Sequence, residues 1–256
     1  MSKTLRRRYR DLGPRGFARW VLQKRLGKGI LRQLDKVIEK SSQTASSPVF
    51  NADEFEWTGL LEERTPAIQK ELEFILAQRE KLPVLSDIQP DQDRIASDHW
   101  KVFPLRAFNL RAKKNCERVP ETARVLDEIP RVTTAWISIL GPHAHIPRHS
   151  GYTRGILRCH LGLVVPESNE RCEMEVGDTR VRWEVGKCVI FDDRCKHEVW
   201  NDTDEERVLL LLDVERPMSW PGHLALQMQH AILRFSPFLR DARRNLQAWE
   251  ERVYQS

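Results

Sequence analysis

The chain has 256 residues, of which 40% are apolar and 31% are charged. This composition excludes a disordered or fibrous protein, and no apolar run approaches the roughly 18 residues that suggest a membrane-spanning helix. A chain of this length can bury a large core without disulfides, so we expect one large domain or one domain with a helical extension.

Basic residues gather at the front of the chain. Residues 1–40 hold 13 Lys and Arg against 3 Asp and Glu, whereas residues 41–256 hold 29 against 34. Apolar residues from Phe17 to Ile38 recur every three or four positions, which predicts a basic amphipathic helix in an extension over residues 1–45. Such a helix either docks its apolar stripe on the domain or lies on an anionic membrane surface, and both alternatives stay open. The acidic body argues against nucleic acid as a partner.

Residues 46–99 are expected to form a linker and helices that pack on the main domain. A Ser-rich stretch, EKSSQTASSPVF, leads into the helical stretch TPAIQKELEFILAQREKL. In that stretch Thr65 is suited to the N-cap position and Pro66 to the first helical position. The helix is therefore predicted to begin at Pro66.

From about Trp100 onward, short strand-like runs alternate with turn signals. The runs are TTAWISILG, ILRCHLGLVVP, CEMEVGDTRVRWEVG, KCVIFDD, HEVWN and RVLLLLDVE. Gly177 and Asp178 are typical of a hairpin turn in the third run. The pattern predicts a mainly β fold, a jelly-roll (cupin-like, double-stranded β-helix) barrel over residues 100–220, with flanking N- and C-terminal helices. The C-terminal helical tail is expected over residues 221–256.

The cysteines and the N-terminus indicate the compartment. The five cysteines are odd in number and form no Cys-x-x-Cys pair, which predicts reduced thiols, with Cys159 and Cys188 as small buried residues. The N-terminal apolar residues are spread among charges and form no secretory signal. We therefore expect a cytoplasmic protein, peripheral on the inner face of the membrane if the basic helix binds lipid.

Polar residues occupy one face of several predicted strands. Because side chains alternate along a strand, Arg158 and His160 share a face, as do Arg207 and Asp213 on the last strand. Burying a guanidinium in a barrel costs several kcal/mol unless an anion meets it. An interior arginine therefore implies a bound carboxylate or phosphate; the alternative is an arginine at a strand end that reaches solvent.

Five motifs together resemble one known family. They are DHWKVFPL, ISILGPHAHIPRH, HSGYTRGILRCHLGLVVP, GKCVIFDDRCKHEVWND and RVLLLLDVERP. In this order and at these intervals they look like the aspartyl/asparaginyl beta-hydroxylase family of Fe(II)- and 2-oxoglutarate-dependent oxygenases. The resemblance runs from about Trp100 to Pro217.

The resemblance implies roles for particular residues. Its iron ligands correspond to His149 and His197. Its 2-oxoglutarate contacts correspond to residues on three of the predicted strands and to a tryptophan of the cosubstrate region: Ser138, Arg158, His160, Arg207 and Trp100. His145 is expected to order the loop or to face solvent.

The resemblance also implies an iron site with only two protein ligands. Most oxygenases of this broad class add a carboxylate two residues after the first histidine, but here that position is Gly151. Asp192 and Asp193 precede His197, and we expect them to form a turn or to contact the side chains of the metal ligands without binding the metal. A carboxylate introduced at position 151 is then expected to reach a vacant position on the metal. Such a position also allows chloride to bind, although the family favours hydroxylation.

The implied activity is hydroxylation of an unactivated C–H bond, with 2-oxoglutarate and O2 as cosubstrates and succinate as a product. The basic front end and the DVERPM ending favour a lipid acyl chain, as in the bacterial branch that acts on lipid A or ornithine lipids. Asp or Asn side chains in a peptide, protein or amino-acid intermediate are the alternative substrates. A different class also stays open, namely a protein that binds 2-oxoglutarate without turnover.

Overall fold

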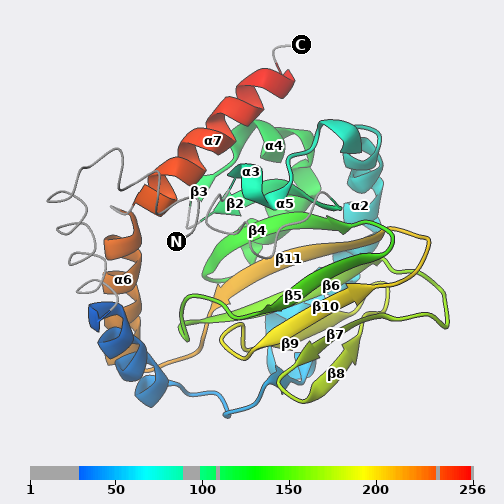
Figure 1. The fold of residues 1–256 in the computed structure, drawn as a ribbon. Coiled ribbons are helices and arrows are strands. Elements are labelled where there is room, and N and C mark those ends of the chain that lie inside the picture. The colour runs from blue at the N-terminus through cyan, green and yellow to red at the C-terminus, as the bar shows by residue number, and fades with distance from the viewer. Residues whose placement is uncertain (1–28, 89–98, 108–109, 235–236, 255–256) are drawn as a thin grey trace, which may run out of the picture.

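Two antiparallel sheets face each other in the computed structural model, which describes residues 29–88, 99–107, 110–234 and 237–254 (Figure 1). The larger sheet has seven strands in the order β1-β9-β6-β11-β4-β2-β3: Val49–Phe50, Cys188–Phe191, Ile156–Val164, Arg207–Glu215, Val132–Leu140, Trp100–Ala107 and Leu110–Arg111. The smaller sheet has the order β5-β10-β7-β8: Ala144–His149, His197–Asn201, Cys172–Val176 and Thr179–Arg182.

The chain order of the strands gives the fold class. Of the eight strands from β4 to β11, the larger sheet takes β4, β6, β9 and β11, and the smaller sheet takes β5, β7, β8 and β10. Chain crossings between two facing sheets define the jelly roll, or double-stranded β-helix. The predicted mainly β barrel with flanking helices is therefore confirmed.

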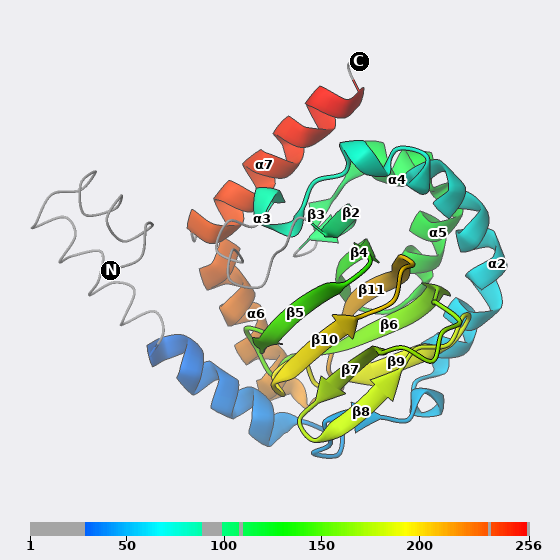
Figure 2. The same ribbon diagram turned by 45° about the vertical axis from the view of Figure 1, so that its right-hand side comes forward.

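The longest strands lie at the centre of the larger sheet because both of their faces are covered. β4, β6 and β11 each have nine residues and are almost wholly buried. One face of the larger sheet looks toward the smaller sheet, and the helix α2 (Glu56–Leu76) lies against the other (Figure 2). A strand that is covered on both faces has a nearly continuous run of apolar residues, as in LLLLDV of β11.

The helix α2 begins ten residues before Pro66, so the predicted start at that proline was wrong. A buried stripe continues through the proline at three- and four-residue spacing: Thr58, Leu61, Thr65, Ile68, Leu72 and Ile75. Thr65 does not cap a helix; its hydroxyl donates to the Leu61 carbonyl at 3.2 Å. Burial of this continuous stripe against the sheet outweighs the hydrogen bond that the proline removes.

Shorter helices close the ends of the barrel, and the strand pattern gave no prediction for α4 and α5. The helices are α3 (Leu85–Ile88), α4 (Lys113–Arg118), α5 (Pro120–Glu128), α6 (Trp220–Arg234) and α7 (Pro237–Tyr254), with 3-10 turns at Ala52–Glu54 and Arg79–Lys81. Pro120 lies in the first turn of α5, where proline is common, so the sequence did contain a signal for the start of this helix. Side chains of α7 reach back: Asn245 donates to the Asp87 carbonyl, and the Trp249 indole donates to the Lys81 carbonyl.

Part of the predicted N-terminal helix docks on the domain. Residues 29–41 are helical, and Ile38 packs with Met218 and Leu226 in a small core beside α6. Asp35 accepts a hydrogen bond from the Arg154 backbone at 2.8 Å. Docking is thus confirmed for this stretch, while the apolar positions before residue 29 lie outside the described residues. The predicted domain boundaries stay predictions.

Other local predictions are confirmed. All five cysteines are free, and Cys159 and Cys188 are buried. Gly177 turns between β7 and β8 with a φ of 61°, a conformation that glycine adopts without strain. The strand β5, which the sequence pattern did not reveal, is an edge strand and so tolerates Pro147.

Candidate active site

One face of the larger sheet carries the polar residues singled out from the sequence. Arg158 lies opposite Asp213, and His160 lies opposite Leu211, which is paired on its other side with Trp136. Paired residues in antiparallel strands share a face. This face looks toward the smaller sheet, because Phe191, opposite Arg158, contacts the ring of His197. The predicted alternation of side chains is therefore confirmed.

Two histidines meet where the smaller sheet covers this face. His149 ends β5, His197 begins β10, and their ring centroids lie 4.1 Å apart. Nδ1 of His149 donates to the Pro147 carbonyl at 2.8 Å, and Nδ1 of His197 donates to the Cys195 carbonyl at 2.9 Å. Because a carbonyl oxygen only accepts, each Nδ1 carries the proton and each Nε2 keeps its lone pair. The two rings are therefore arranged as a pair of neutral metal ligands.

Burial keeps both imidazoles neutral. It lowers the pKa of His149 to about 4, with a further contribution from the neighbouring His197, and it lowers the pKa of His197 to about 4. Neutral imidazole is the form that binds a divalent transition metal, so no proton has to leave at neutral pH.

The metal-free protein is expected to lose stability as the pH falls from about 6.5 to 4. The unfolded chain takes up protons at its ordinary histidine pKa while the buried rings do not, so acid favours unfolding in this window. For His197, which is 2% exposed, the loss at pH 5 is on the order of 2 kcal/mol. Urea unfolding at pH 7.5 and 5 measures it. His197→Gln should flatten the dependence, and a slope equal to that of the wild type would contradict the assignment.

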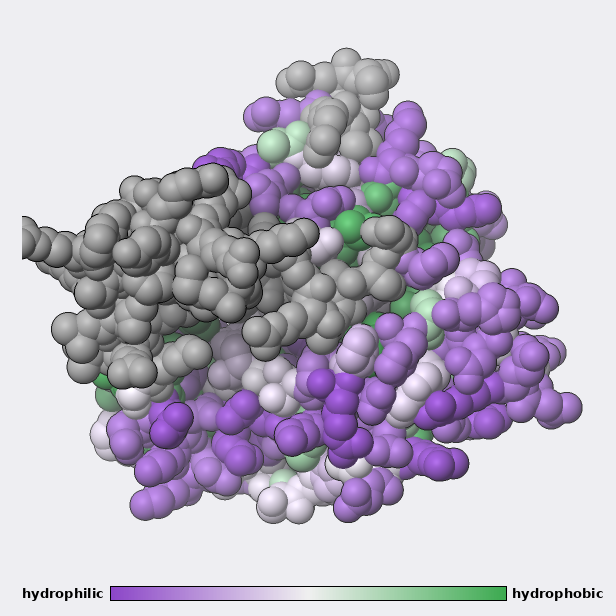
Figure 3. All heavy atoms as spheres, viewed as in Figure 1, coloured by the Kyte–Doolittle hydropathy of each residue, from purple (hydrophilic) through white to green (hydrophobic). Residues whose placement is uncertain are grey.

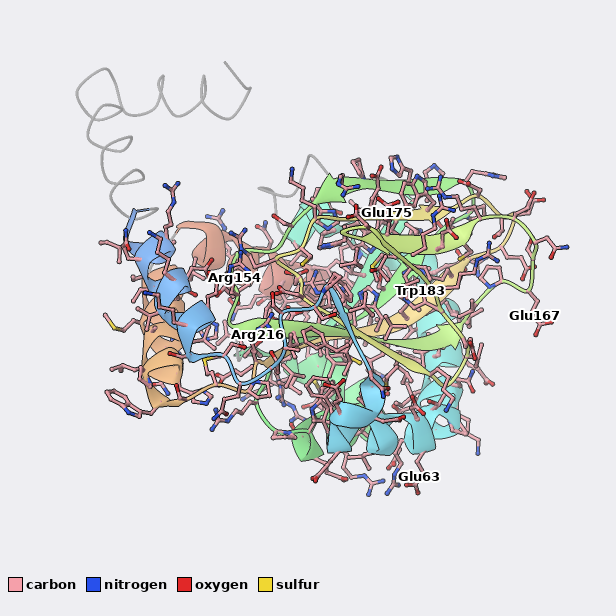
Figure 4. The ribbon with its side chains drawn as sticks, turned by 90° about the horizontal axis from the view of Figure 1, so that it is seen from below. Glu63, Arg154, Glu167, Glu175, Trp183 and Arg216 are labelled. Carbon is pink, nitrogen blue, oxygen red and sulfur yellow. The ribbon has the colours of Figure 1, made fainter. Side chains whose placement is uncertain are left out.

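Arg207 is buried without a carboxylate. It is 2% exposed, and its Nε and Nη2 have no hydrogen-bond partner among the described residues. The guanidinium carbon lies 4.7 Å from the ring centre of Trp183, which Figure 4 labels between the two sheets. Burial lowers the pKa of Arg207 to about 10. A buried arginine with unpaired donors is costly until an anion binds it.

His160 adds further unpaired groups next to Arg207. Neither ring nitrogen of His160 has a partner among the described residues, and the same holds for the indole Nε1 of Trp183. The His160 ring lies 5.0 Å from Phe191 and 6.0 Å from Trp183. Burial and the charge of Arg207 hold the pKa of His160 well below its usual value. Neutral His160, Trp183 and Arg207 together offer hydrogen bonds to a small anion.

Arg158, by contrast, is already paired within the protein. Its Nε and Nη2 donate to the two carboxylate oxygens of Asp213 at 2.8 and 3.1 Å, and its Nη1 lies 2.7 Å from Oδ1 of Asp193. Burial acts against the charge, but the two carboxylates raise the pKa of Arg158 above its ordinary value. The expectation that both interior arginines need an external anion was therefore wrong for Arg158. Its contact with 2-oxoglutarate stays a prediction.

Ser138 and Trp100 lie together on neighbouring strands at the far end of the same face. The Trp100 indole donates to the Ser138 hydroxyl at 3.0 Å, and both side chains are buried. Trp100 also lies opposite Leu140, whose other neighbour is Arg207. The structure thus brings Ser138 and Trp100 close to Arg207. His145 is exposed, as expected, and forms a hydrogen bond between its Nε2 and the Glu198 carboxylate at 2.8 Å.

The position two residues after His149 is already filled. A Cβ atom added to Gly151 would lie 1.5 Å from Oδ2 of Asp193. Oδ1 of that carboxylate lies 3.7 Å from Nε2 of His197. Asp192 forms the turn beside it, because its Oδ1 accepts from the Arg194 backbone at 2.9 Å. The expectation that a carboxylate side chain at residue 151 has room to reach the metal was therefore wrong, because Asp193 occupies that space. The vacant position on the metal itself stays a prediction.

Gly151→Ala is expected to destabilise the protein by about 1–3 kcal/mol, because the new methyl group displaces the buried Asp193 carboxylate from Arg158. Gly151→Asp should be worse, because it adds a like charge at the same point. The double variant Gly151→Asp/Asp193→Gly removes both the overlap and the extra charge and should recover stability. Denaturant unfolding measures all three, and wild-type stability of Gly151→Ala would contradict this packing.

Fe(II) and 2-oxoglutarate fit these residues. The two free Nε2 lone pairs suit a divalent iron, and the unpaired donors of Arg207, His160 and Trp183 suit a dicarboxylate. Within the residues that the structure describes, no group of three or more His, Cys, Asp or Glu side chains is arranged around a metal position. The fit therefore rests on His149 and His197.

Sequence reasoning missed several residues of this site. Trp183 follows β8 and has the pattern of an ordinary apolar position. The strand parity places Trp136 on the same face as Ser138, but it predicted no role for the indole. Asp213 was placed on the correct face, but its pairing with Arg158 was not foreseen. The sequence did contain a signal for this pairing, because an aspartate inside the run LLLLDV is unusual and an interior arginine needs a negatively charged partner.

Comparison with known proteins places this chain among hydroxylases. A model of the aspartyl/asparaginyl beta-hydroxylase family matches residues 62–217. The ornithine lipid ester-linked acyl 2-hydroxylase of Rhizobium tropici is 36% identical over 216 residues, which cover 84% of this chain and 77% of that protein. The human aspartyl/asparaginyl beta-hydroxylase is 34% identical over 136 residues, 51% of this chain but 18% of that protein.

Solved structures show only a distant likeness. A Pseudomonas putida prolyl-4-hydroxylase matches with a TM-score of 0.40 and 11% identity, over 62% of this chain and 99% of that one. This similarity is too low to support an argument about function.

Proposed function

This chain belongs to the aspartyl/asparaginyl beta-hydroxylase family, and from that premise we propose that it is an Fe(II)- and 2-oxoglutarate-dependent dioxygenase that hydroxylates a lipid acyl chain. The observation that carries the proposal is the buried, carboxylate-free Arg207 on the same face that the two histidines cover. Unpaired buried donors beside a pair of histidines support a cosubstrate site next to a metal site.

In this proposal the protein binds and orients the reactants. His149 and His197 hold the iron through Nε2, and their Nδ1 hydrogen bonds fix the ring orientation. Arg207 receives the distal carboxylate of 2-oxoglutarate through its planar fork, with His160 and Trp183 beside it. Arg158 holds Asp193 next to His197. Bound iron supplies the activation of O2 that an unactivated C–H bond requires.

The lipid substrate is supported by the relative that this chain matches over most of its length. The Rhizobium tropici protein is by name an acyl 2-hydroxylase of an ornithine lipid. The human protein that is named for Asp and Asn hydroxylation matches over half of this chain. The alternative substrate is therefore an Asp or Asn side chain in a peptide, protein or amino-acid intermediate.

Purified protein with Fe(II), 2-oxoglutarate and O2 should convert an acylated membrane lipid to a product that is one oxygen heavier, with one succinate released per product. Lipid extracts and Asp-containing peptides are tested in parallel, and product masses are measured with and without chloride. Succinate release that depends only on the peptide would overturn the lipid assignment. Tight 2-oxoglutarate binding without succinate from any substrate would favour the alternative of a non-catalytic binding protein.

We further propose that the front end contacts an anionic membrane surface. No described helix has both the length and the apolar character of a membrane span. On α6, however, three apolar side chains spaced four residues apart stay exposed next to the helix 29–41: Trp220 (75%), Leu224 (50%) and Met228 (48%). A tryptophan at the edge of an apolar stripe, with basic residues nearby, is typical of interfacial binding.

Trp220→Ser is expected to weaken binding to vesicles of anionic lipid about tenfold, because the indole is the largest apolar group of the exposed stripe. Sedimentation with vesicles measures it. Val185→Ser, a change of an exposed apolar residue elsewhere, is the matched control. Equal binding of both variants would remove α6 from the membrane contact.

A further inference from the structure

A cavity of about 740 Å³ lies at the end of the barrel where β2, β3, α3, α4 and α7 meet (Figures 1 and 2). Its lining includes side chains from each of these elements, and most of it is apolar: Leu85 and Ile88 of α3, Val102 and Pro104 of β2, and Leu246 of α7. Figure 3 shows hydrophobic residues at the surface around α3 and α4, with hydrophilic residues about them. The volume lies in the range of small-molecule sites.

The inner end of this cavity adjoins the candidate active site. Trp136 lines the cavity, and its ring centre lies 5.8 Å from the guanidinium carbon of Arg158. Arg158 in turn contacts Asp193, which lies beside His197. The indole Nε1 of Trp136 is buried and has no acceptor among the described residues. A ligand that fills the cavity therefore ends at Trp136, a buried donor that is free to bind a carbonyl oxygen, and Arg158 and Asp193 connect this point to His197.

The outer rim of the cavity is basic. Four basic and two acidic side chains line it: Arg106, Arg111, Lys113, Lys114, Glu117 and Glu250. Arg106 and Arg111 both bind Asp127, at 2.5 and 2.6 Å. Neither Lys113 nor Lys114 forms an ion pair with any residue that the structure describes. Lys114 acts electrostatically on the rim carboxylate of Glu250, so the rim offers a negatively charged ligand the ammonium group of Lys113 and a share in that of Lys114.

We propose that this cavity binds the acyl chain of the substrate lipid, with a phosphate- or carboxylate-bearing head group held by Lys113 and Lys114 at the rim. The apolar lining takes the chain, Trp136 binds the carbonyl oxygen of the acyl linkage, and the reacting carbon beside that carbonyl lies on the side of the cavity that faces Arg158 and, beyond it, the histidine pair. The inference rests on the proposed lipid hydroxylase function and adds to it the path by which the chain enters and the charge of the head group.

The test uses binding to the full-length, metal-free protein, so that it does not depend on turnover. The probe is a single-chain lysophospholipid with a phosphate head group and a photoreactive diazirine in its chain, used below its micelle concentration. After illumination, peptide mass spectrometry locates the cross-link. We expect it at residues of the lining, within 85–88, 102–107, 110–117 or 246–250 or at Trp136. Each methylene removed from the chain should weaken binding about fourfold.

Two pairs of variants separate the chain site from the head-group site. Ala107→Trp places a bulky ring at the cavity lining and should lower cross-linking at least tenfold, while Ala77→Trp, at an exposed residue outside the lining, should not. Lys113→Glu/Lys114→Glu should weaken binding of the phosphate probe about tenfold and leave an uncharged monoacylglycerol probe unaffected. Lys70→Glu/Lys81→Glu makes the same charge change on exposed residues away from the cavity and is the control.

The outcomes distinguish this inference from the function on which it rests. Cross-linking outside the cavity, or equal cross-linking in Ala107→Trp and Ala77→Trp, would overturn the chain site even if the protein hydroxylates lipids. Equal loss of the phosphate probe in both lysine pairs would overturn the head-group site. Cavity cross-linking by a protein that hydroxylates only peptides would refute the proposed function and leave a lipid-binding cavity.

Discussion

Arg207→Ala is expected to weaken 2-oxoglutarate binding by about 2–5 kcal/mol, because the variant leaves one carboxylate of the bound cosubstrate without its partner in a buried pocket. Arg207→Lys should recover only part of the loss, since an ammonium keeps the charge but not the planar fork. Iron binding should hardly change in either variant, because the arginine is not a metal ligand. Titration of 2-oxoglutarate into the anaerobic Fe(II) protein, followed by the absorbance of the iron chelate, measures the affinity.

A second property of Arg207 supplies a control that needs no metal. Burial of this unpaired cation lowers its pKa to about 10, which means that the charge is unfavourable in these buried surroundings without an anion. Arg207→Met, which keeps most of the side-chain volume, should therefore leave the unliganded protein at least as stable as the wild type. A large loss of stability without ligand would instead show that Arg207 holds the fold together, and wild-type 2-oxoglutarate affinity in Arg207→Ala would remove it from the site.

His197→Ala is expected to abolish Fe(II) binding at micromolar metal and to abolish turnover, because one of two protein ligands is lost. The fold should survive, since the ring of His197 contributes one hydrogen bond to a neighbouring carbonyl. His145→Ala is the matched control: His145 lies on β5, four residues before His149, but it faces solvent against Glu198 and Trp200. Anaerobic iron titration compares the two variants.

Two results would contradict the assignment of His197 as a metal ligand. Wild-type iron affinity in His197→Ala would show that the metal binds elsewhere, and equal losses in His145→Ala would show a general effect of the substitution. Circular dichroism of both variants checks that they keep the fold.

The strands could be predicted because alternation and apolar runs are local signals. Each long run between β4 and β11 forms a strand, and the parity that placed Arg158 with His160 is the parity seen in the sheet. The missed strand β5 has a proline and only two buried residues, Ala144 and Ile146, so its pattern is that of a loop. Its strand conformation comes from pairing with β10, which is a tertiary effect.

Helix boundaries were less predictable for the same reason. Thr65 and Pro66 are strong local start signals, yet α2 runs through them because its buried stripe begins at Thr58. Local preference near a proline amounts to a few kcal/mol, and burial of several large side chains exceeds it.

The candidate site shows what a single sequence leaves out. The two histidines and Arg207 were identified through family resemblance, but the pairing of Arg158 with Asp213 and Asp193 depends on the register of three strands. The overlap between Asp193 and a side chain at Gly151 depends on how two turns pack. Such contacts join residues 35 to 55 positions apart, and no local pattern encodes them.

The most direct test of the proposed dioxygenase is the fate of labelled oxygen. The protein is incubated with Fe(II), 2-oxoglutarate, an acylated membrane lipid and ¹⁸O₂, and both products are analysed by mass spectrometry. The proposed reaction places one ¹⁸O atom on the acyl chain and the other in succinate, with CO₂ released from 2-oxoglutarate in equal amount. A lipid product without label, or a labelled lipid formed without succinate, would contradict the proposed function.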